Sequence, residues 1–538
     1  MAADAIETLG DHLTEIKLEL ARMRELLVHA EAERDEYKKL FLLLREENEK
    51  LKLGLLGQKA ERLDANDRQL SLSILEMLLG KKAEPAAPAT EPVRAHERKK
   101  PTGRKPLPEH LERVELELIP LDVQQEGLEN FDRIGEEVSE ALERRPASTV
   151  VVVTRQPKFA RKDRPRHGPT RVLIAEVPEL PIARGLAGPG LLADTIVRRW
   201  QDHQPLDRLE RIFARDGIEL ARSTICGWHK ELAELARPIV EAMRRDALAQ
   251  PYLCTDATGV LVQAPEKCRT GHFWVLVAPE RHVIFSYSPR HDGAGVDLLL
   301  AGYEGYLVAD AHSVYDHLYA NGKVIEVGCW AHLRRYFFKT LGSEPERARE
   351  ALALIGELFA IERETERASP SERLAVRQAK SRLIVERFFE WRSELAETAL
   401  DETPLAKALG YAKNHRVAFE RFLQDGRLPI HNNWSELQLR RQVIGRKNWL
   451  FIGSDEAAEV NTVFVSLLAS CAMHGIEPWR YLRDLLCLLP RWPYNRVLEL
   501  APVNWQQTLE NPDTQQRLEA NPFRTAILAL ERAHPDIE

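Results

Sequence analysis

The sequence lacks the cysteine pattern of a protein held together by disulfides or by zinc. Its 538 residues include six cysteines, and no two of them form a C-x-x-C pair. We therefore expect reduced thiols in an intracellular protein, and no zinc cofactor. The six are Cys226, Cys254, Cys268, Cys329, Cys471 and Cys487.

Long apolar runs and targeting segments are missing as well. No run of about 18 uncharged apolar residues occurs, so neither a membrane span nor a membrane partner is expected. The first residues, Met-Ala-Ala-Asp, lack the basic and apolar segments of a secretory signal. The length suits about three or four domains, so we expect a multidomain cytoplasmic protein.

An overall excess of basic residues is also absent, because the net charge is −7. Positive charge is nevertheless concentrated locally. Residues 155–171 carry seven Lys and Arg against one acid, and residues 94–105 carry six against one. Phosphates respond to the charge within a Debye length of about 10 Å, so the acidic total does not exclude a DNA-binding protein.

A heptad pattern over residues 6–55 is the clearest structural signal. Thirteen of fifteen seam positions can pack apolar surface, which predicts a coiled coil within a dimerisation helix of residues 1–79. Asn48 at a seam position favours a parallel dimer. We expect a homodimer or higher oligomer through residues 6–55, and the alternative is a long helix folded back on its own domain.

Two basic segments follow the seam. Residues 80–108 predict a basic Pro/Ala linker, and Arg104 and Lys105 near its end can enter a minor groove or belong to a solvated spacer. Residues 109–184 predict a small β-rich domain. Its basic loop either contacts the DNA backbone or is simply solvated. The candidate contacts in this loop are Arg161, Lys162, Arg164 and Arg166.

Residues 185–245 have the spacing of consecutive helices and predict a helix-turn-helix DNA-binding domain. The first helix of the pair ends at Gly217, and Ser223 is the predicted N-cap of the second. A helical hairpin of an ordinary domain would give the same spacing. The side chains that the second helix would present to a DNA groove are those of Arg222, Ser223, Thr224, His229 and Lys230.

From residue 251 the apolar period changes from that of a helix to that of a strand. Three β-rich runs, a helix and two further strands predict a ribonuclease-H-like α/β catalytic domain in residues 246–341. Asp256 then lies in the first strand, and Asp310 ends the fourth. The runs are residues 252–263, 271–278 and 281–287, the helix is 294–300, and the later strands are 306–310 and 323–327.

The catalytic domain is expected to be interrupted. Residues 342–427 predict an all-helical insert, with a capping box at Ser369 and Glu372. Residues 428–490 predict its second part, and residues 491–538 are a helical C-terminal region with no assigned role. Glu436 opens a helix after Asn432 and Asn433. The insert does not prevent a shared site, because loop-closure cost grows only logarithmically with length.

Asp256, Asp310 and Glu436 are the candidate catalytic and metal-binding residues. Three carboxylates from separate elements can hold two divalent ions for phosphoryl transfer. Magnesium prefers oxygen ligands, so Mg²⁺ is the expected cofactor, and Mn²⁺ can substitute for it. The ordinary alternative for each acid is a surface or capping carboxylate.

Further candidate DNA contacts surround the third acid. Arg440 lies one helical turn after Glu436 and can touch phosphate or form a salt bridge. Arg446 and Lys447 continue the basic tract. His332 is either a scissile-strand contact or a core hydrogen-bond donor. Trp449 either stacks on an unpaired base or is buried.

With these residues in place, the chain resembles the DDE transposases of the insertion sequence 66 family. The resemblance rests on residues 255–259 (TDATG), 305–310 (GYLVAD), 328–335 (GCWAHLRR), 432–436 (NNWSE) and 444–454 (IGRKNWLFIGS). It implies a bacterial enzyme that binds the terminal inverted repeats of an element, cleaves there and joins the 3′-hydroxyls to target DNA. It also implies nucleoid association on DNA, with accessory proteins of the element as further partners.

The chain departs from the family pattern at two places. Residues 124–127 and 160–163 stand where members usually carry a cysteine zinc motif, and Ala257 replaces an acidic residue after the first catalytic aspartate. Two other functions remain open: a transposase-derived, non-catalytic DNA-binding protein, and a ribonuclease-H-like nuclease. The nuclease explains neither the dimer seam nor a site-reading domain.

Overall fold

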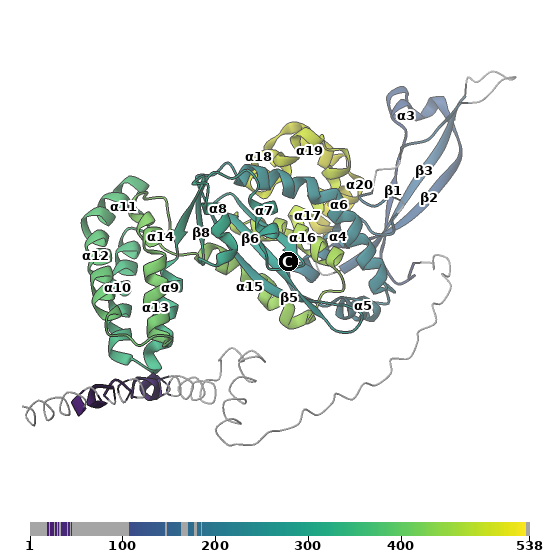
Figure 1. Cartoon of the computed structure of the whole chain (residues 1–538). Helices are drawn as coiled ribbons and strands as arrows, with labels where there is room; N and C mark the ends of the chain where they lie inside the picture. Colours follow the sequence, from purple (N-terminus) through teal and green to yellow (C-terminus); the bar gives the residue numbers. More distant parts are fainter. Residues whose placement is uncertain are drawn as a thin grey trace, which may run out of the picture. The chain divides into compact units, whose positions relative to one another are not determined.

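The computed structural model describes residues 107–533, apart from 146–147, 163–170, 177–179 and 184, together with part of residues 19–45. It contains two compact units (Figure 1). One comprises residues 1–99 and 327–431, and the other comprises residues 100–326 and 432–538. Helices predominate and two sheets are present, so the predicted multidomain α+β class is confirmed.

The residues between Glu19 and Arg45 that the structure describes are all helical. Seam residues Leu20, Met23 and Leu27 are 43%, 60% and 60% exposed. Further along, Lys39 pairs with Glu402 of the same unit. The rest of the seam and the linker with Arg104 and Lys105 lie outside the described residues, so dimerisation stays a prediction.

A four-stranded sheet forms the β-rich part. The long antiparallel pair β2 (Phe131–Arg145) and β3 (Ser148–Arg161) is joined by β1 (Arg113–Glu117), parallel to β3, and by β4 (Val172–Leu173). Val150 and Val152 of β3 are buried and pack against Phe523 and Ile527.

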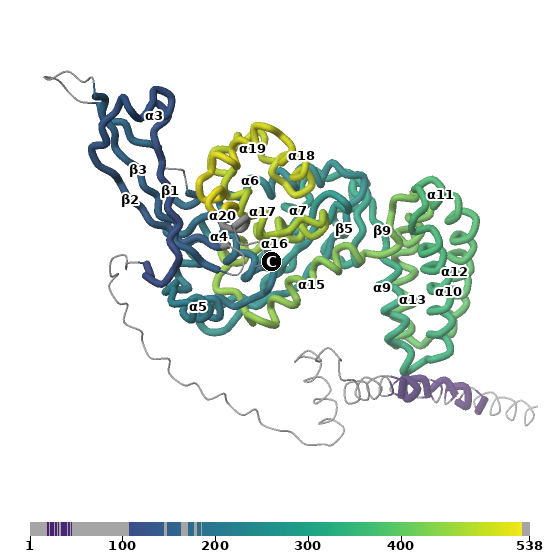
Figure 2. Tube along the Cα trace, turned by 180° about the vertical axis from the view of Figure 1, so that it is seen from behind, coloured from purple at the N-terminus to yellow at the C-terminus, as the bar shows by residue number. Residues whose placement is uncertain are grey.

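Phe523 and Ile527 lie in α20 (Pro522–Ala533), at the end of the chain. This helix follows α18 (Trp505–Glu510) and α19 (Pro512–Glu519) and packs on the β2–β3 sheet (Figure 2). The helical C-terminal region, which had no assigned role, therefore completes the core of the β-rich part.

The helices directly before the central sheet lie between residues 189 and 247. They are α4 (Pro189–Ile196), α5 (Leu206–Arg215) and α6 (Arg222–Ala247), with a π-helical turn η2 (Val197–Gln201) after α4. Gly217 has φ of +72° in the turn between α5 and α6. The predicted N-cap Ser223 is wrong. Ala221 is the cap, because the chain is still extended there, at φ −69° and ψ 145°.

The central sheet has the order β7-β6-β5-β8-β9. Strands β5, β6 and β7 are antiparallel, and β8 pairs parallel to β5. The predicted order of meander, helix and two strands is therefore confirmed. The elements are β5 (Tyr252–Val262), β6 (Arg269–Ala278), β7 (His282–Ser288), α7 (Gly293–Leu300), β8 (Gly305–Ala309) and β9 (Val324–Gly328).

Helix α16 (Asp455–Met473) covers the edge strand β7. The amides of Val283 and Phe285 donate to the hydroxyls of Ser470 and Ser466, at 3.0 and 2.8 Å. The helix is long and apolar enough to cross a membrane, with a mean hydropathy of 1.2, but 72% of that stretch is buried in the molecule. Packing against β7 accounts for its apolar character.

The unit that contains residues 327–431 is helical and is called the helical unit below. This stretch is longer than the predicted insert of residues 342–427, because it includes α9 (Trp330–Lys339). Trp330 is fully buried and lies 5.2 Å from Phe419, centroid to centroid. The capping box of Ser369 and Glu372 is confirmed. Further helices of this unit are α10 (Pro345–Glu364), α11 (Pro370–Val376), α12 (Arg382–Ala396), α13 (Pro404–Asn414) and α14 (Arg416–Glu420).

Candidate active site

Asp256 lies in β5, and Asp310 directly follows the last residue of the neighbouring strand β8. In the parallel pair of β5 and β8, Cys254 is the partner of Val308. Each aspartate lies two residues further along its own segment, so both follow the side-chain alternation to the same face of the sheet. Adjacent strands lie about 4.8 Å apart. Two acids far apart in sequence are thus close in space.

Tyr315 reports on both carboxylates. Its side chain is 1% exposed. Burial raises the pKa of Tyr315 well above its ordinary value, and the negative charges of Asp310 and Asp256 raise this pKa further. Both carboxylates act on the same phenol, so Tyr315 lies close to Asp310 and Asp256.

The backbone around each aspartate is also engaged. The Asp256 carboxylate accepts from the amide of Ala257 at 2.7 Å, and the Asp310 carboxylate accepts from the amide of His312 at 3.1 Å. Ala311, which lies between Asp310 and His312 in the chain, has φ of +57°. A left-handed conformation at a non-glycine residue costs on the order of 1–3 kcal/mol and tends to occur at functional sites. It turns the chain sharply where β8 ends.

Glu436 lies in the first turn of α15 (Asn433–Trp449). Asn432, the residue before this helix, is fully buried, and its side-chain amide donates to the carbonyl of Thr255 at 2.8 Å. The amide of Glu436 donates to the carbonyl of Asn432 at 3.2 Å. The turn that carries the third acid is thus attached to β5, one residue before Asp256.

A second contact holds α15 against β5. Arg446 donates to the hydroxyl of Thr258 at 2.9 Å and also to the carbonyl of Gly259. Arg446 was a candidate DNA contact, and in the structure its guanidinium ties helix to strand. Arg440 and Lys447 are exposed on the same helix.

The donor chemistry of this site suits magnesium. The part of the chain that the structure describes contains no group of three or more His, Cys, Asp or Glu side chains placed to hold a metal ion. However, Mg²⁺ is usually held by one or two carboxylates with water and substrate phosphate, rather than by a cage of protein ligands. The adjacent carboxylates of Asp256 and Asp310 fit that pattern.

A group of imidazole and indole rings that the sequence analysis missed lies beside Asp310. His291 lies 4.7 Å from His272 and 4.8 Å from His312, and it stacks on Trp274 at 5.1 Å, centroid to centroid. Partial burial lowers the pKa of His291, as does the neighbouring His312, while the charge of Asp310 opposes this. The spacing Asp310-x-His312 was the available signal.

His312 has a defined hydrogen-bonding role. Its Nδ1 accepts from the amide of Val314 at 3.2 Å. Nδ1 must therefore be unprotonated, and in the neutral ring the proton is on Nε2. The neutral ring therefore carries one donor, at Nε2.

The start of α6 carries most of the predicted groove-reading residues. Arg222, Ser223, Thr224 and Lys230 are exposed. Arg222 lies 3.0 Å from Glu210, and Lys230 lies 3.1 Å from Glu456. Both ion pairs are exposed and are therefore weak enough to exchange for phosphate.

The prediction that His229 faces a groove is wrong. The residue is 2% exposed, and its Nε2 lies 3.1 Å from the hydroxyl of Thr195. Burial lowers the pKa of His229 to about 3. The ring lies 5.8 Å from Phe464 of α16, so packing of α16 against α6 widens the buried face of the helix.

The remaining candidates lie in three places. Arg161 and Lys162 are exposed at the end of β3, where Arg161 pairs with Glu126 and Lys162 donates to the carbonyl of Glu129 at 2.8 Å. Half-buried His332 is on α9, in the helical unit. Arg164 and Arg166 lie outside the described residues, as do Arg104 and Lys105.

Comparison with known proteins places these features in one family. The model described as "Transposase IS66 family" matches residues 184–460. That described as "IS66 C-terminal element" matches residues 466–503. A third, "Transposase C of IS166 homeodomain", matches residues 43–116, most of which lie outside the described residues.

Two relatives from Sinorhizobium fredii extend over most of the chain. The uncharacterized protein y4hP is 30% identical over 492 residues, covering 85% of this chain and 88% of the relative. The uncharacterized protein y4qI is 33% identical over 482 residues, covering 84% and 86%. The chain belongs to the IS66 transposase family.

Proposed function

We propose that the chain is a DNA transposase that binds the terminal inverted repeats of its element, cleaves at the ends and joins the 3′-hydroxyls to target DNA. The observation that supports this most strongly is the parallel register of β5 and β8, which brings the segments with Asp256 and Asp310 side by side, with the first turn of α15 attached to Thr255. The strand order of the central sheet is consistent with a ribonuclease-H-like domain.

In this proposal Asp256, Asp310 and Glu436 present carboxylate oxygens to the reacting phosphate group. Mg²⁺, or Mn²⁺ in its place, would be held by these oxygens and would stabilise the charge that builds on the entering and leaving oxygens. The contact between Asn432 and Thr255 attaches the turn that carries Glu436 to β5, one residue before Asp256. The sharp turn at Ala311 keeps Asp310 at the C-terminal end of β8.

The chain's other residues bind and orient the DNA. The exposed cations at the start of α6 exchange their acidic partners for phosphates of the element end. Arg440 and Lys447 line α15 beyond the acid and contact the backbone of the cleaved strand. The Nε2 proton of His312 is available to a phosphate oxygen next to Asp310.

Transposition needs two ends held together, so we propose a homodimer through residues 6–55. The exposed seam residues Leu20, Met23 and Leu27 would be buried in it. The active protein would be cytoplasmic and bound to the nucleoid when on DNA, with accessory proteins of the same element as further partners.

The test is an assay of end cleavage and strand transfer. The full chain is incubated with Mg²⁺ and genomic fragments that flank its gene, and with the same fragments carrying scrambled ends. Wild type is expected to cut the native ends and join them to a plasmid. Asp256→Asn, Asp310→Asn and Glu436→Gln are each expected to bind the ends with unchanged affinity and to cut below detection.

Three results would count against the proposal. Specific binding without cleavage by wild type would mark a transposase-derived, non-catalytic DNA-binding protein. Equal cutting of native and scrambled ends would mark a general nuclease. Undiminished cutting by the three variants would show that the chemistry lies elsewhere.

A further inference from the structure

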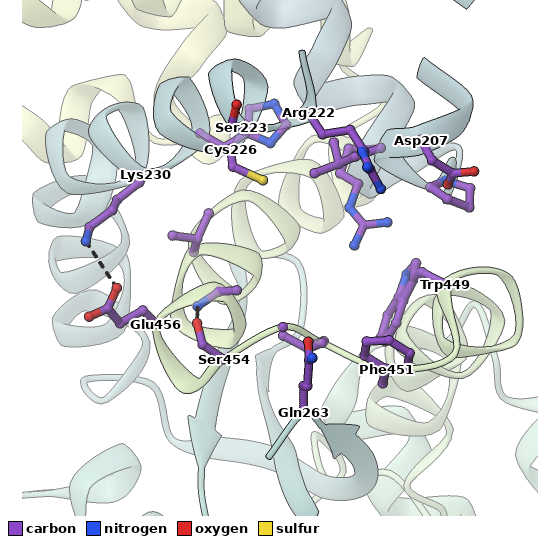
Figure 3. A pocket seen from close by; sticks show the side chains of 18 of the residues that line it. Asp207, Arg222, Ser223, Cys226, Lys230, Gln263, Trp449, Phe451, Ser454 and Glu456 are labelled. Carbon is purple, nitrogen blue, oxygen red and sulfur yellow. Dashed lines mark hydrogen bonds and ion pairs between the residues drawn. The ribbon is translucent and has the colours of Figure 1, made fainter. Parts of the chain in front are cut away.

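A pocket of about 780 Å³ lies between the start of α6 and the segment that follows α15, away from the three acids. Figure 3 shows Arg222 and Cys226 of α6 on one side of it and Trp449 and Phe451 on the other. Arg199 of the π-helical turn η2 also lines it. All of these residues belong to one compact unit.

Arg199 is the unusual member of this lining. It is 9% exposed, and its Cζ lies 4.6 Å from the ring centroid of Trp200 and 5.6 Å from that of Trp449. Its Nη1 donates to the carbonyl of Gln204 at 3.3 Å, while its Nε has no hydrogen-bond partner in the part of the chain that the structure describes. A buried guanidinium with an unused donor is a preformed site for an anion.

The other cations in the pocket are already paired. Arg222 lies 3.0 Å from Glu210, and Lys230 lies 3.1 Å from Glu456. Arg211 lies 3.6 Å from Asp207. Among the described residues, no carboxylate lies within 4.0 Å of Arg199. The lining holds four cations against the two acids Asp207 and Glu456, so it favours an anionic ligand.

The aromatic wall opposite Arg222 is built by a strained turn. Leu450 has φ of +64° and ψ of −51°, and the amide of Phe451 donates to the carbonyl of Trp449 at 2.8 Å. This is a γ-turn of the rare positive-φ kind. Ile452 then pairs with the end of β5, where its amide donates to the carbonyl of Leu261 at 2.8 Å.

The turn leaves the two rings in different roles. Trp449 is 9% exposed and packs in a core cluster, with its ring over Gly445, where an added Cβ would come within 2.8 Å of Nε1. Phe451 is 43% exposed at the pocket. Trp449 therefore fixes the wall and the buried cation, and Phe451 offers a free aromatic face.

We propose that this pocket holds one unstacked nucleotide of the bound DNA, with its base on Phe451 and its phosphate at Arg199 and Arg222. An aromatic face beside a fixed cation is the pairing that recognises an unpaired nucleotide, because every base has a stacking face and a phosphate next to it. This inference rests on the proposed function only in taking DNA as the ligand. A free nucleotide shares the chemistry and is separated by the test.

The experiment uses the full chain and three probes: a fluorescein-labelled duplex with a short single-stranded thymidine tail, the same duplex with blunt ends, and free thymidine monophosphate. Affinities are measured by fluorescence anisotropy without divalent metal, so no cleavage occurs. Phe451→Ala is expected to weaken binding of the tailed duplex about tenfold and to leave binding of the blunt duplex within about twofold. Tyr494→Ala removes an aromatic ring that is 66% exposed elsewhere in the same unit, and should change neither.

Arg199→Met is expected to weaken binding of the tailed duplex to the same extent as Phe451→Ala. If that variant fails to fold, the Phe451→Ala result still decides. Placing 5-iodo-2′-deoxyuridine in the tail should give a photo-crosslink to the peptide that contains Phe451. Equal weakening on both duplexes, no weakening on either, or a crosslink confined to other peptides would overturn the proposal.

The free nucleotide separates the two sources of the ligand. Thymidine monophosphate that binds as tightly as the tailed duplex and displaces it would overturn the assignment to DNA. Binding of the tail does not depend on the three acids. Wild type that prefers the tailed duplex but does not cut the element ends would therefore count against the proposed chemistry alone. Wild type that cuts the ends but shows no preference for the tail would count against the pocket alone.

Discussion

The side-chain amide of Asn432 donates to the backbone carbonyl of Thr255 at 2.8 Å, joining residues 177 positions apart in the chain. Asn432 is the N-cap of α15, yet its side chain forms no capping bond within the helix. The residue attaches the helix to the strand instead, and so keeps the turn with Glu436 next to Asp256. The Asn-Asn-x-x-Glu run therefore packs α15 against β5 and also carries Glu436, the proposed third acid.

Replacing Asn432 by alanine should uncouple α15 from β5. The buried carbonyl of Thr255 would lose its donor, at a cost of about 1–3 kcal/mol. A displaced Glu436 should lower the rate of end cleavage by about ten- to a hundredfold, with unchanged affinity for the end. Asn433→Ala, at the exposed neighbouring position, is the matched control. Equal rates for the two variants would contradict a positioning role for Asn432.

Glu143 should make the folded protein less stable as the pH rises. It is 1% exposed, and burial raises the pKa of Glu143 from 4.5 to about 8. Because the pKa of Glu143 is raised in the folded protein, its favourable contribution to the free energy of unfolding is complete below about pH 4.5. This contribution is lost as the pH rises toward 8. The loss is at most about 5 kcal/mol.

Glu143→Gln keeps the shape of the side chain without the titration. The variant should gain thermal stability relative to wild type between pH 5 and pH 8, measured as the difference in unfolding midpoint across that range. A difference that stays constant with pH, or that falls as pH rises, would show that Glu143 does not titrate in this way.

His229 should act in the opposite direction. Burial lowers the pKa of His229 from 6.5 to about 3. Because the folded pKa is depressed, its contribution is complete above about pH 6.5 and is lost as pH falls toward 3. His229→Gln should therefore be less acid-sensitive than wild type in thermal unfolding between those limits. Identical acid profiles would place a water-accessible, protonatable ring at this position.

The seam proposed for the N-terminal helix can be tested by charge. Leu20→Glu with Leu27→Glu places two carboxylates in a dimer interface and should convert a dimer to a monomer in sedimentation equilibrium. Val28→Glu changes an apolar residue that is 66% exposed but off the seam, and should leave the dimer intact. A monomeric wild type, or equal dissociation in both proteins, would contradict dimerisation through residues 6–55.

The sequence predicted those features that depend on local pattern. Alternating apolar residues identified the strand order around Asp256 and Asp310, and Ser369 with Glu372 identified a helix start. These signals survive because strand alternation and capping are short-range. The parallel register of β5 and β8, which brings the segments with the two aspartates side by side, could not be derived from spacing alone.

Features set by packing between distant segments were missed. Nothing near Asn432 shows that its amide reaches Thr255, and nothing near Phe523 shows that α20 completes the core of the β-rich part. His229 was misjudged because the neighbouring helix α16 decides which side of α6 is buried. Arg199 was overlooked because its importance depends on the rings that surround it.

The most direct test of the central claim asks whether an Asp310 oxygen binds the metal ion. Mg²⁺ takes oxygen ligands, whereas a first-row transition ion such as Mn²⁺ accepts sulfur more readily. End cleavage by Asp310→Cys should therefore be lost with Mg²⁺ and partly restored with Mn²⁺, while Asp310→Ala should stay inactive with both. If the cysteine variant stays as inactive as the alanine variant in Mn²⁺, or cuts fully in Mg²⁺, Asp310 does not hold the ion.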